Sequence, residues 1–262
     1  MNSTVQQVLN KKLNTSEQAR QKLAPIVARL LGSNSKVGHH VESIFTMFWD
    51  LARKADDMID YSNSTDKRWL EVLQHVFFMC SKAENLPKEI PAKLWLDTIS
   101  HFFYLMSSTC KGEIDDLLSY KPSLSNYEYM VLQKTGPWFA GRIACTALAI
   151  GVYENPLLTD LQEFGKFVSL AYQIRNDILD IETEQKDLTI GKLNYPSVLL
   201  MLKRPSFSLD NDAKIPQGLY YSQRTIELAN LAADRYEEKA KRIALKYDCK
   251  LGQLTLDLCS SR

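Results

Sequence analysis

Features that would point to a membrane, a secretory route or nucleic acid are missing from this sequence. The formal net charge is only +1, which gives no electrostatic reason to expect nucleic acid as a partner. No run of about 18 apolar residues occurs, so we expect no membrane span. The first 14 residues are polar and lack the apolar region of a signal peptide.

Cysteine and glycine are also scarce. The five cysteines are scattered without a metal-ligand spacing, which favours reduced thiols in a cytoplasmic protein. Ten glycines in 262 residues are few for a β-rich fold with many tight turns, whereas a hydrophobic content of 45% allows a substantial core. These features favour a helical bundle. We expect a single domain over residues 1–262, with residues 1–14 as a flexible N-terminal arm.

Two acidic clusters organise the chain. The first acidic cluster is Arg53-Lys54-Ala55-Asp56-Asp57-Met58-Ile59-Asp60, and the second is Gln173-Ile174-Arg175-Asn176-Asp177-Ile178-Leu179-Asp180, about 120 residues later. Both lie in apolar segments with helical periodicity, so positions four apart, such as Asp56 and Asp60, share one face. Two such faces opposite each other would form a cup of oxygen ligands suited to Mg²⁺.

A solvated helix face is the alternative interpretation of each cluster alone. Apolar residues precede both clusters, however, so we expect their carboxylates to be at least partly buried. Burying several like charges is unfavourable unless cations or other partners neutralise them. Because the pattern occurs twice, we favour metal-dependent phosphate chemistry.

With three further stretches, the clusters resemble the trans-isoprenyl diphosphate synthase (polyprenyl synthetase) family. Lys134-Thr135-Gly136 resembles its K-T-G/A, Tyr172-Gln173-Ile174 its F-Q-I, and Gly191-Lys192-Leu193-Asn194-Tyr195-Pro196 its G-K-x-T-x-P. Order and spacing fit along roughly residues 20 to 200. The resemblance implies an all-α, isoprenoid synthase-type bundle of about ten helices around a central cavity.

The resemblance also implies the residues of the site. The metal ligands would be Asp56, Asp57, Asp60, Asn176, Asp177, Asp180 and Glu184, holding Mg²⁺ as three ions with the substrate diphosphate. The catalytic residues would be Lys134, Thr135, Gln173 and Lys192, whose lysines donate to the departing oxygens. The substrate-binding residues would be Lys22, Arg20, Phe48, Trp49, Ala52, Arg53, Trp138 and Phe139.

Two of these assignments stay open. The family binds its acceptor diphosphate through G-G-K-R-L-R-P, and in Arg20-Gln21-Lys22-Leu23-Ala24-Pro25 only Lys22 and Pro25 match well, although Arg20 could substitute in part. A solvated basic helix end is an equal alternative for this stretch. Arg53 lies one turn before the first aspartates, so an ion pair with them and a contact to diphosphate are equally open.

Large aromatic residues precede the first acidic cluster. In the family, bulk at such positions limits product length, so Phe48 or Trp49 as a cavity floor implies a short product of about ten to twenty carbons. Phe48, Trp49, Trp138 and Phe139 would supply inert or π-rich walls, with ordinary core packing as the alternative for each. Pro137 should break its helix just after Lys134-Thr135-Gly136.

Two other helices carry further expectations. Gly112-Glu113-Ile114-Asp115-Asp116 resembles the family's G-Q-x-x-D/E, and we interpret its two aspartates as a solvated face rather than part of an acidic rim. A final long helix is expected over residues 219–247, with Leu231 among its core residues.

The second acidic cluster allows a different class of enzyme. Asn176, Asp180 and Glu184 at i, i+4 and i+8 also resemble the N-D-x-x-S/T/D-x-x-x-E metal triad of class I terpene cyclases. We therefore carry a prenyltransferase that joins an allylic isoprenyl diphosphate to isopentenyl diphosphate or another acceptor, a cyclase without an acceptor, and a non-catalytic subunit of a heteromeric prenyl synthase. The resemblance favours the first and implies a homodimer.

Overall fold

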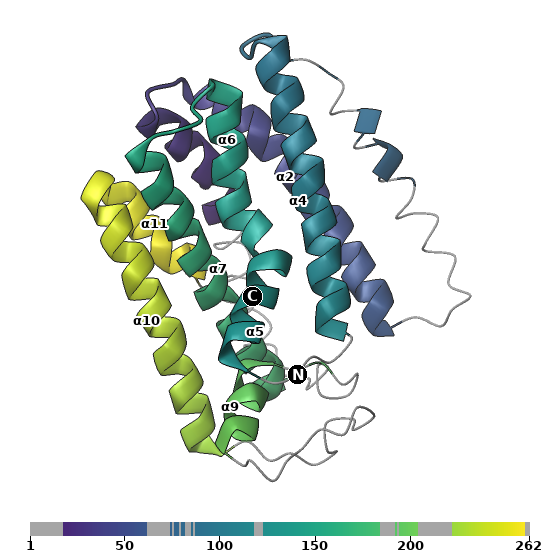
Figure 1. Cartoon of the computed structure of the whole chain (residues 1–262), viewed down its shortest axis with the longest axis vertical. Helices are drawn as coiled ribbons and strands as arrows, with labels where there is room; N and C mark the ends of the chain where they lie inside the picture. Colours follow the sequence, from purple (N-terminus) through teal and green to yellow (C-terminus); the bar gives the residue numbers. More distant parts are fainter. Residues whose placement is uncertain are drawn as a thin grey trace, which may run out of the picture.

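The computed structural model describes residues 18–61, 74, 76–78, 80, 81, 85, 87–117, 123–183, 192, 194–203 and 222–259. Throughout these residues, every regular element is a helix, which confirms the expected all-α fold (Figure 1). Within the same ranges, none of the helices combines the length and the apolar character needed to cross a membrane.

The bundle is built around α7. A first helix covers residues 18–30, and the later elements are α2 (Ser35–Tyr61), α4 (Ala92–Leu117), α5 (Leu124–Lys134), the π-helix η1 (Pro137–Gly141), α6 (Arg142–Ile150), α7 (Pro156–Thr183), α9 (Tyr195–Lys203), α10 (Gln223–Tyr247) and α11 (Cys249–Cys259). Helix α7 contacts α5, η1, α6, α9, α10 and α11. Figure 1 shows α10 and α11 on one side of it and α2 with α4 on the other.

The first helix ends at residue 30, just before a glycine. Gly32 has φ +82°, a left-handed conformation that costs a glycine little, and Ser33 and Asn34 follow it. Helix α2 then returns beside the first helix, and Gly38 permits a close approach, because a Cβ atom there would lie 2.5 Å from the Ala24 carbonyl oxygen. Leu23 and Phe45 of these two helices are fully buried in the core.

Pro137 breaks the helix as expected. It has no N–H, and helix α5 ends at Lys134, three residues before it. The chain continues as the π-helix η1, in which the Arg142 N–H donates to the Pro137 carbonyl oxygen five residues back. Gly165 of α7 packs closely against this segment, since a Cβ atom there would lie 2.6 Å from the backbone of Ala140.

The C-terminal part differs from the sequence expectation. Leu231, expected in the core, is 48% exposed, because the buried face of α10 consists of Thr225 and of alanines at positions 229, 233, 240 and 244. Small side chains at this spacing let α10 lie close along α7. Helix α11 was not predicted, and its residues Leu251, Leu254 and Leu258 are buried.

Candidate active site

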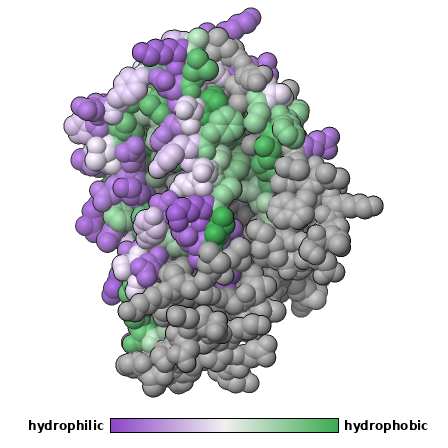
Figure 2. Space-filling model, turned by 45° about the vertical axis from the view of Figure 1, so that its right-hand side comes forward, coloured by the Kyte–Doolittle hydropathy of each residue, from purple (hydrophilic) through white to green (hydrophobic). Residues whose placement is uncertain are grey.

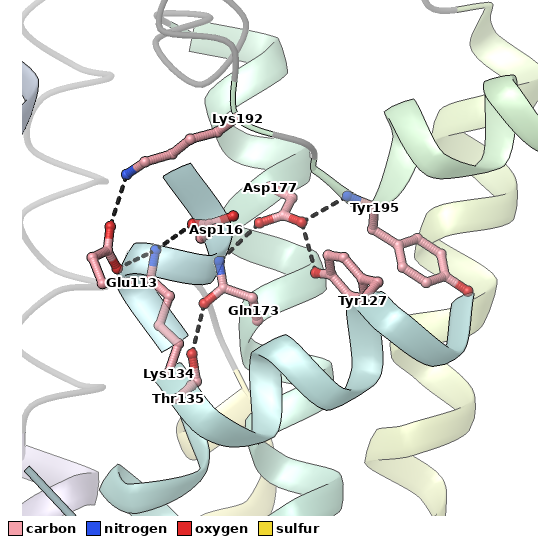
Figure 3. Close-up of polar contacts among 9 residues, drawn as sticks. All are labelled: Glu113, Asp116, Tyr127, Lys134, Thr135, Gln173, Asp177, Lys192 and Tyr195. Carbon is pink, nitrogen blue, oxygen red and sulfur yellow. Dashed lines mark hydrogen bonds and ion pairs between the residues drawn. The ribbon is translucent and has the colours of Figure 1, made fainter. Parts of the chain in front are cut away.

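Two lysines meet two carboxylates where α4, α5 and the segment before α9 come together (Figure 3). Lys134 of α5 lies with its Nζ 2.7 Å from Glu113 Oε2 and 2.8 Å from Asp116 Oδ2. Lys192 lies with its Nζ 2.9 Å from Glu113 Oε1. Glu113 therefore binds one lysine with each of its oxygens, and both lysines expected at a diphosphate lie at one place.

The cluster is largely removed from solvent. Burial alone would raise the pKa of Glu113, but the charges and hydrogen bonds of Lys134 and Lys192 outweigh it and hold this pKa at about 2. Burial and Lys134 act to lower the pKa of Lys192, and the carboxylates of Glu113 and Asp116 more than compensate, so it is raised. Glu113 and Lys192 are thus both charged at neutral pH.

A glycine makes the lysine–carboxylate contact possible. A Cβ atom at Gly112 would lie only 2.5 Å from the Lys134 backbone nitrogen. Helix α4 therefore approaches α5 by backbone contact. Glu113 and Asp116, one turn apart on α4, then both reach the Lys134 ammonium group.

A second polar chain runs from α5 into the second acidic cluster. Thr135 Oγ1 donates to Gln173 Oε1 at 2.8 Å, and Gln173 Nε2 donates to Asp177 Oδ1 at 2.9 Å. The other oxygen of Asp177 accepts from the Tyr127 hydroxyl at 2.6 Å and from the Tyr195 N–H at 2.8 Å (Figure 3). Asp177 thereby ties α7 to α5 and α9.

Asp177 lies in the interior, with 3% of its surface exposed. Burial raises its pKa to about 6, the charge of Asp116 adds to this effect, and the donors from Tyr127, Tyr195 and Gln173 oppose it. Hydrogen bonds occupy both of its carboxylate oxygens, so Asp177 orders the helices of the site. Its role as a metal ligand stays a prediction.

Asn176 offers an oxygen that fits a metal ion. Its Oδ1 is buried and accepts no hydrogen bond from the residues that the structure describes, which is costly for a polar atom unless a ligand completes it. Asp180 lies one turn further along α7, on the same face and partly exposed. An amide and a carboxylate oxygen at this spacing are hard ligands of the kind that Mg²⁺ accepts.

The structure does not describe the side chains of four other predicted metal ligands. Asp56, Asp57 and Asp60 belong to the last turns of α2, but their side chains, like Glu184, lie outside the described residues. Among the side chains that are described, no three His, Cys, Asp or Glu residues gather closely enough to hold a metal. The pairing of the two acidic clusters therefore stays a prediction.

Three of the four predicted wall residues, Phe48, Trp49 and Trp138, form one aromatic group. Phe48 stacks on Trp138 with centroids 4.9 Å apart, and Trp49 meets the same indole edge to face at 4.7 Å. Phe102 of α4 packs against Phe48, while Phe139 is fully buried and contacts the Tyr172 ring. Phe48, Trp138 and Phe139 are buried core residues in this structure. The interpretation as ordinary core packing therefore holds for them, and their role as cavity walls stays a prediction.

Arg20 and Lys22 do not form a common basic pocket. Arg20 is only 5% exposed, and its guanidinium carbon lies 4.2 Å from the ring centroid of Trp49, whereas Lys22 faces solvent. On α2, Ala52 is partly buried and Arg53 is exposed. The stretch expected to bind an acceptor diphosphate thus holds one arginine packed on an indole and one separate lysine.

Sequence reasoning misjudged one carboxylate, Asp116, and did not assign Glu113, Tyr127 or Tyr195 to the site. Asp116, interpreted as part of a solvated face, is 5% exposed and paired with Lys134. Asp115 does face outward and pairs with Lys111. For Glu113 and Asp116, the signal in the sequence was their spacing of three residues within a stretch that resembles G-Q-x-x-D/E. Tyr127 and Tyr195 carried none, because their contacts depend on tertiary packing.

The fold is that of solved prenyl synthases. Geranylgeranyl pyrophosphate synthetase from the archaeon Geoglobus acetivorans superposes with a TM-score of 0.73 at 18% identity, covering 92% of this chain and 84% of that one. Heptaprenyl diphosphate synthase from Staphylococcus aureus gives a TM-score of 0.67 at 18% identity, covering 95% and 97%. At such identities the likeness establishes the fold.

The family follows from the sequence. The polyprenyl synthetase family model matches residues 2–203, and the chain belongs to this family, as the resemblance implied. Farnesyl diphosphate synthase from Haemophilus influenzae is 32% identical over 106 residues, 34% of each chain. The enzyme of that name from Geobacillus stearothermophilus is 38% identical over 85 residues, 29% of this chain and 28% of its own. The chain spans about a third of the length of the curated relatives it matches.

Proposed function

We propose that this protein is a Mg²⁺-dependent prenyltransferase. It ionises an allylic isoprenyl diphosphate and joins the allyl group to isopentenyl diphosphate or another acceptor, giving a short product of about ten to twenty carbons. The observation that carries the proposal is the convergence of Lys134 and Lys192 on Glu113. Two ammonium groups at one place, beside the helix of the second acidic cluster, suit a leaving diphosphate.

The chain's own residues divide the work. Lys134 and Lys192 donate to the diphosphate oxygens as negative charge develops on them. Thr135 and Gln173, hydrogen-bonded to each other, connect the end of α5 to α7 and so fix Lys134 relative to the second acidic cluster. The apolar group around Trp138 keeps water from the allylic cation.

Mg²⁺ fits the donor set of α7. Asn176 Oδ1 is buried and has no hydrogen-bond partner in the described part of the chain, and Asp180 follows one turn later. We assign both as ligands, with Asp56, Asp57, Asp60 and Glu184 as further candidates. When bound, the metal neutralises charge on the leaving diphosphate.

A class I terpene cyclase is the second candidate, and one specific observation favours it. The buried guanidinium of Arg20 packs on Trp49, while Lys22 points to solvent. A second diphosphate would need convergent basic groups, and this stretch presents a closed cation–π contact instead. A cyclase needs no acceptor, and a transferase with a different acceptor would be equally compatible.

Product analysis separates these functions. The full chain is incubated with Mg²⁺ and geranyl, farnesyl or geranylgeranyl diphosphate, with and without isopentenyl diphosphate, and the products are identified by mass spectrometry. Longer diphosphates that form only with isopentenyl diphosphate would support the transferase. Hydrocarbons or alcohols formed without it would establish the cyclase. Unchanged substrate in every incubation would contradict the cyclase and a transferase that uses isopentenyl diphosphate, and it would favour a different acceptor or a non-catalytic subunit.

We further propose a homodimer through α4. Leu96, Phe103, Tyr104 and Ile114 of α4 are exposed, and Leu96, Phe103 and Ile114 lie within about 20° of one another around an ideal helix. Figure 2 shows apolar surface gathered in a band on the side that carries α4. An apolar stripe is self-complementary, so a second copy related by a twofold axis can cover it.

Light scattering tests the dimer. Phe103→Glu should shift the mass from dimer to monomer, whereas Tyr153→Glu, a comparable change at an exposed aromatic residue between α6 and α7, should leave it unchanged. A monomeric wild-type protein at micromolar concentration would contradict the proposal.

A further inference from the structure

The carboxylate at position 113 is a departure from the pattern that this stretch resembles. Where G-Q-x-x-D/E has a glutamine, this chain has Glu113. The side chain is mostly buried, and its oxygens lie 2.7 Å and 2.9 Å from the ammonium groups of Lys134 and Lys192. A neutral amide of the same shape could not make two ion pairs.

Among the residues that the structure describes, the formal charges of this group cancel. Lys134 and Lys192 contribute two positive charges, and Glu113 and Asp116 contribute two negative charges, all within one set of direct contacts. A free diphosphate that approaches the lysines therefore meets two carboxylates in the same place. To bind, it must take the ammonium groups from Glu113 and leave that carboxylate beside another anion in a poorly solvated site.

We propose that Glu113 is a specificity-determining residue that makes the lysine pair reject metal-free diphosphate and accept diphosphate complexed with a divalent cation. The inference rests on the proposed function only in placing a diphosphate at Lys134 and Lys192. Bound cations reduce the negative charge of the ligand, so the repulsion from Glu113 falls and the lysine donors remain available. The residue thus couples recognition of the leaving group to the presence of the metal.

A titration with inorganic pyrophosphate tests this without turnover. The full chain is titrated by calorimetry in a chelator, and wild type is compared with Glu113→Gln, which keeps the shape and removes one charge. We expect Glu113→Gln to bind metal-free pyrophosphate about tenfold more tightly. With excess Mg²⁺ the two proteins should differ by less than about threefold, because the cation then screens the carboxylate.

Two matched variants separate the role from bulk charge and from folding. Asp115→Asn removes a neighbouring exposed carboxylate that pairs with Lys111, and it should bind metal-free pyrophosphate like wild type. Glu113→Asp keeps the charge, so its affinity for metal-free pyrophosphate should stay as low as that of wild type. A thermal melt of each variant shows that it is folded under the titration conditions.

Each contrary result overturns the inference. Equal or weaker metal-free binding by Glu113→Gln would do so, as would an equal gain in Asp115→Asn. No detectable pyrophosphate binding by Glu113→Gln at millimolar concentration would show that Lys134 and Lys192 do not recognise a diphosphate once the Glu113 charge is removed. If Glu113→Gln bound pyrophosphate more tightly than wild type by the same factor in excess Mg²⁺, Glu113 would not select for the metal-complexed diphosphate. None of these results depends on product formation, so a failure of the proposed reaction is recognised separately.

Discussion

Tyr127 donates a 2.6 Å hydrogen bond to the buried Asp177, 50 residues further along the chain. The bond joins α5 to α7, which the hydrogen bond from Thr135 to Gln173 also connects. Asp177 is almost fully buried, so water cannot replace this donor. Loss of the Tyr127 hydroxyl therefore leaves one carboxylate oxygen with fewer hydrogen bonds.

Tyr127→Phe should therefore lower the free energy of unfolding by about 1–3 kcal/mol. Urea denaturation measures the change. The control is Tyr129→Phe on the same helix, whose side chain is exposed, and its effect should stay within about 0.5 kcal/mol. Equal effects of the two variants would show that the Tyr127–Asp177 bond adds little to stability.

Stability should also depend on pH through Glu42, which pairs with the fully buried Arg142. Burial raises the pKa of Glu42 to about 7, against the opposing effects of Arg142, Thr46 and Arg20. The folded-state pKa lies above the ordinary value of 4.5, so the stabilisation is complete below pH 4.5 and is lost as the pH rises toward 7.

Glu42→Gln should remove this pH dependence, which amounts to at most about 1.4 kcal/mol per pH unit. Chemical denaturation at a series of pH values between 4.5 and 7 measures it. The exposed Glu163 of α7 supplies the control, Glu163→Gln, which should keep the wild-type slope. Parallel curves for wild type and Glu42→Gln would refute the assignment.

The close approach of α4 to α5 makes position 112 sensitive to a single methyl group. Gly112→Ala places a Cβ atom 2.5 Å from the Lys134 backbone nitrogen, so the helices must move apart. We expect a loss of about 1–3 kcal/mol in the free energy of unfolding, measured by urea denaturation. Gly136→Ala is the matched control, since its Cβ atom would meet only the Leu132 side chain at 3.9 Å. An unchanged free energy of unfolding in Gly112→Ala would be incompatible with the close contact between α4 and α5.

Asn176 gives a prediction about the metal. Asn176→Leu removes the buried Oδ1 and should weaken the apparent Mg²⁺ affinity in the presence of pyrophosphate by at least about tenfold, measured by thermal shift across a Mg²⁺ titration. Asn176→Asp retains an oxygen and should bind at least as well as wild type. Asn230→Leu, at an exposed asparagine of α10, serves as the control for the substitution itself. Unaltered Mg²⁺ affinity in Asn176→Leu would exclude this oxygen as a ligand.

The fold could be predicted largely from local signals. The helices of both acidic clusters follow from apolar periodicity, and the break before Pro137 follows from the missing N–H of proline. Helix α11 was not predicted although Leu251, Leu254 and Leu258 have helical spacing, because the segment is short and contains Gly252. Leu231 was misplaced because the close packing of α10 favours alanine over leucine at the buried positions.

The site was predicted less completely, for a physical reason. Lys134, Thr135, Gln173 and Lys192 belong to motifs that a sequence displays, and the structure brings them to one region. The burial of Asp116 and the hydrogen bonds of Tyr127 and Tyr195 depend on how α4, α5 and α9 meet. An exposed and a buried carboxylate on neighbouring positions, as at Asp115 and Asp116, look alike until the partner helix is known.

The π-helix η1 sets the rotational phase of everything that follows it. An additional residue in one turn rotates the succeeding side chains by about 100° relative to a continuous α-helix. Lys134 before the turn reaches the carboxylates of α4, Trp138 within it meets Phe48, and Arg142 after it meets Glu42 and the Arg20 carbonyl oxygen. Removal of one residue between Pro137 and Gly141 would therefore turn Arg142 away from the first helix while Lys134 stayed in place. The length of this short segment is as strictly constrained as the identity of the residues on either side of it.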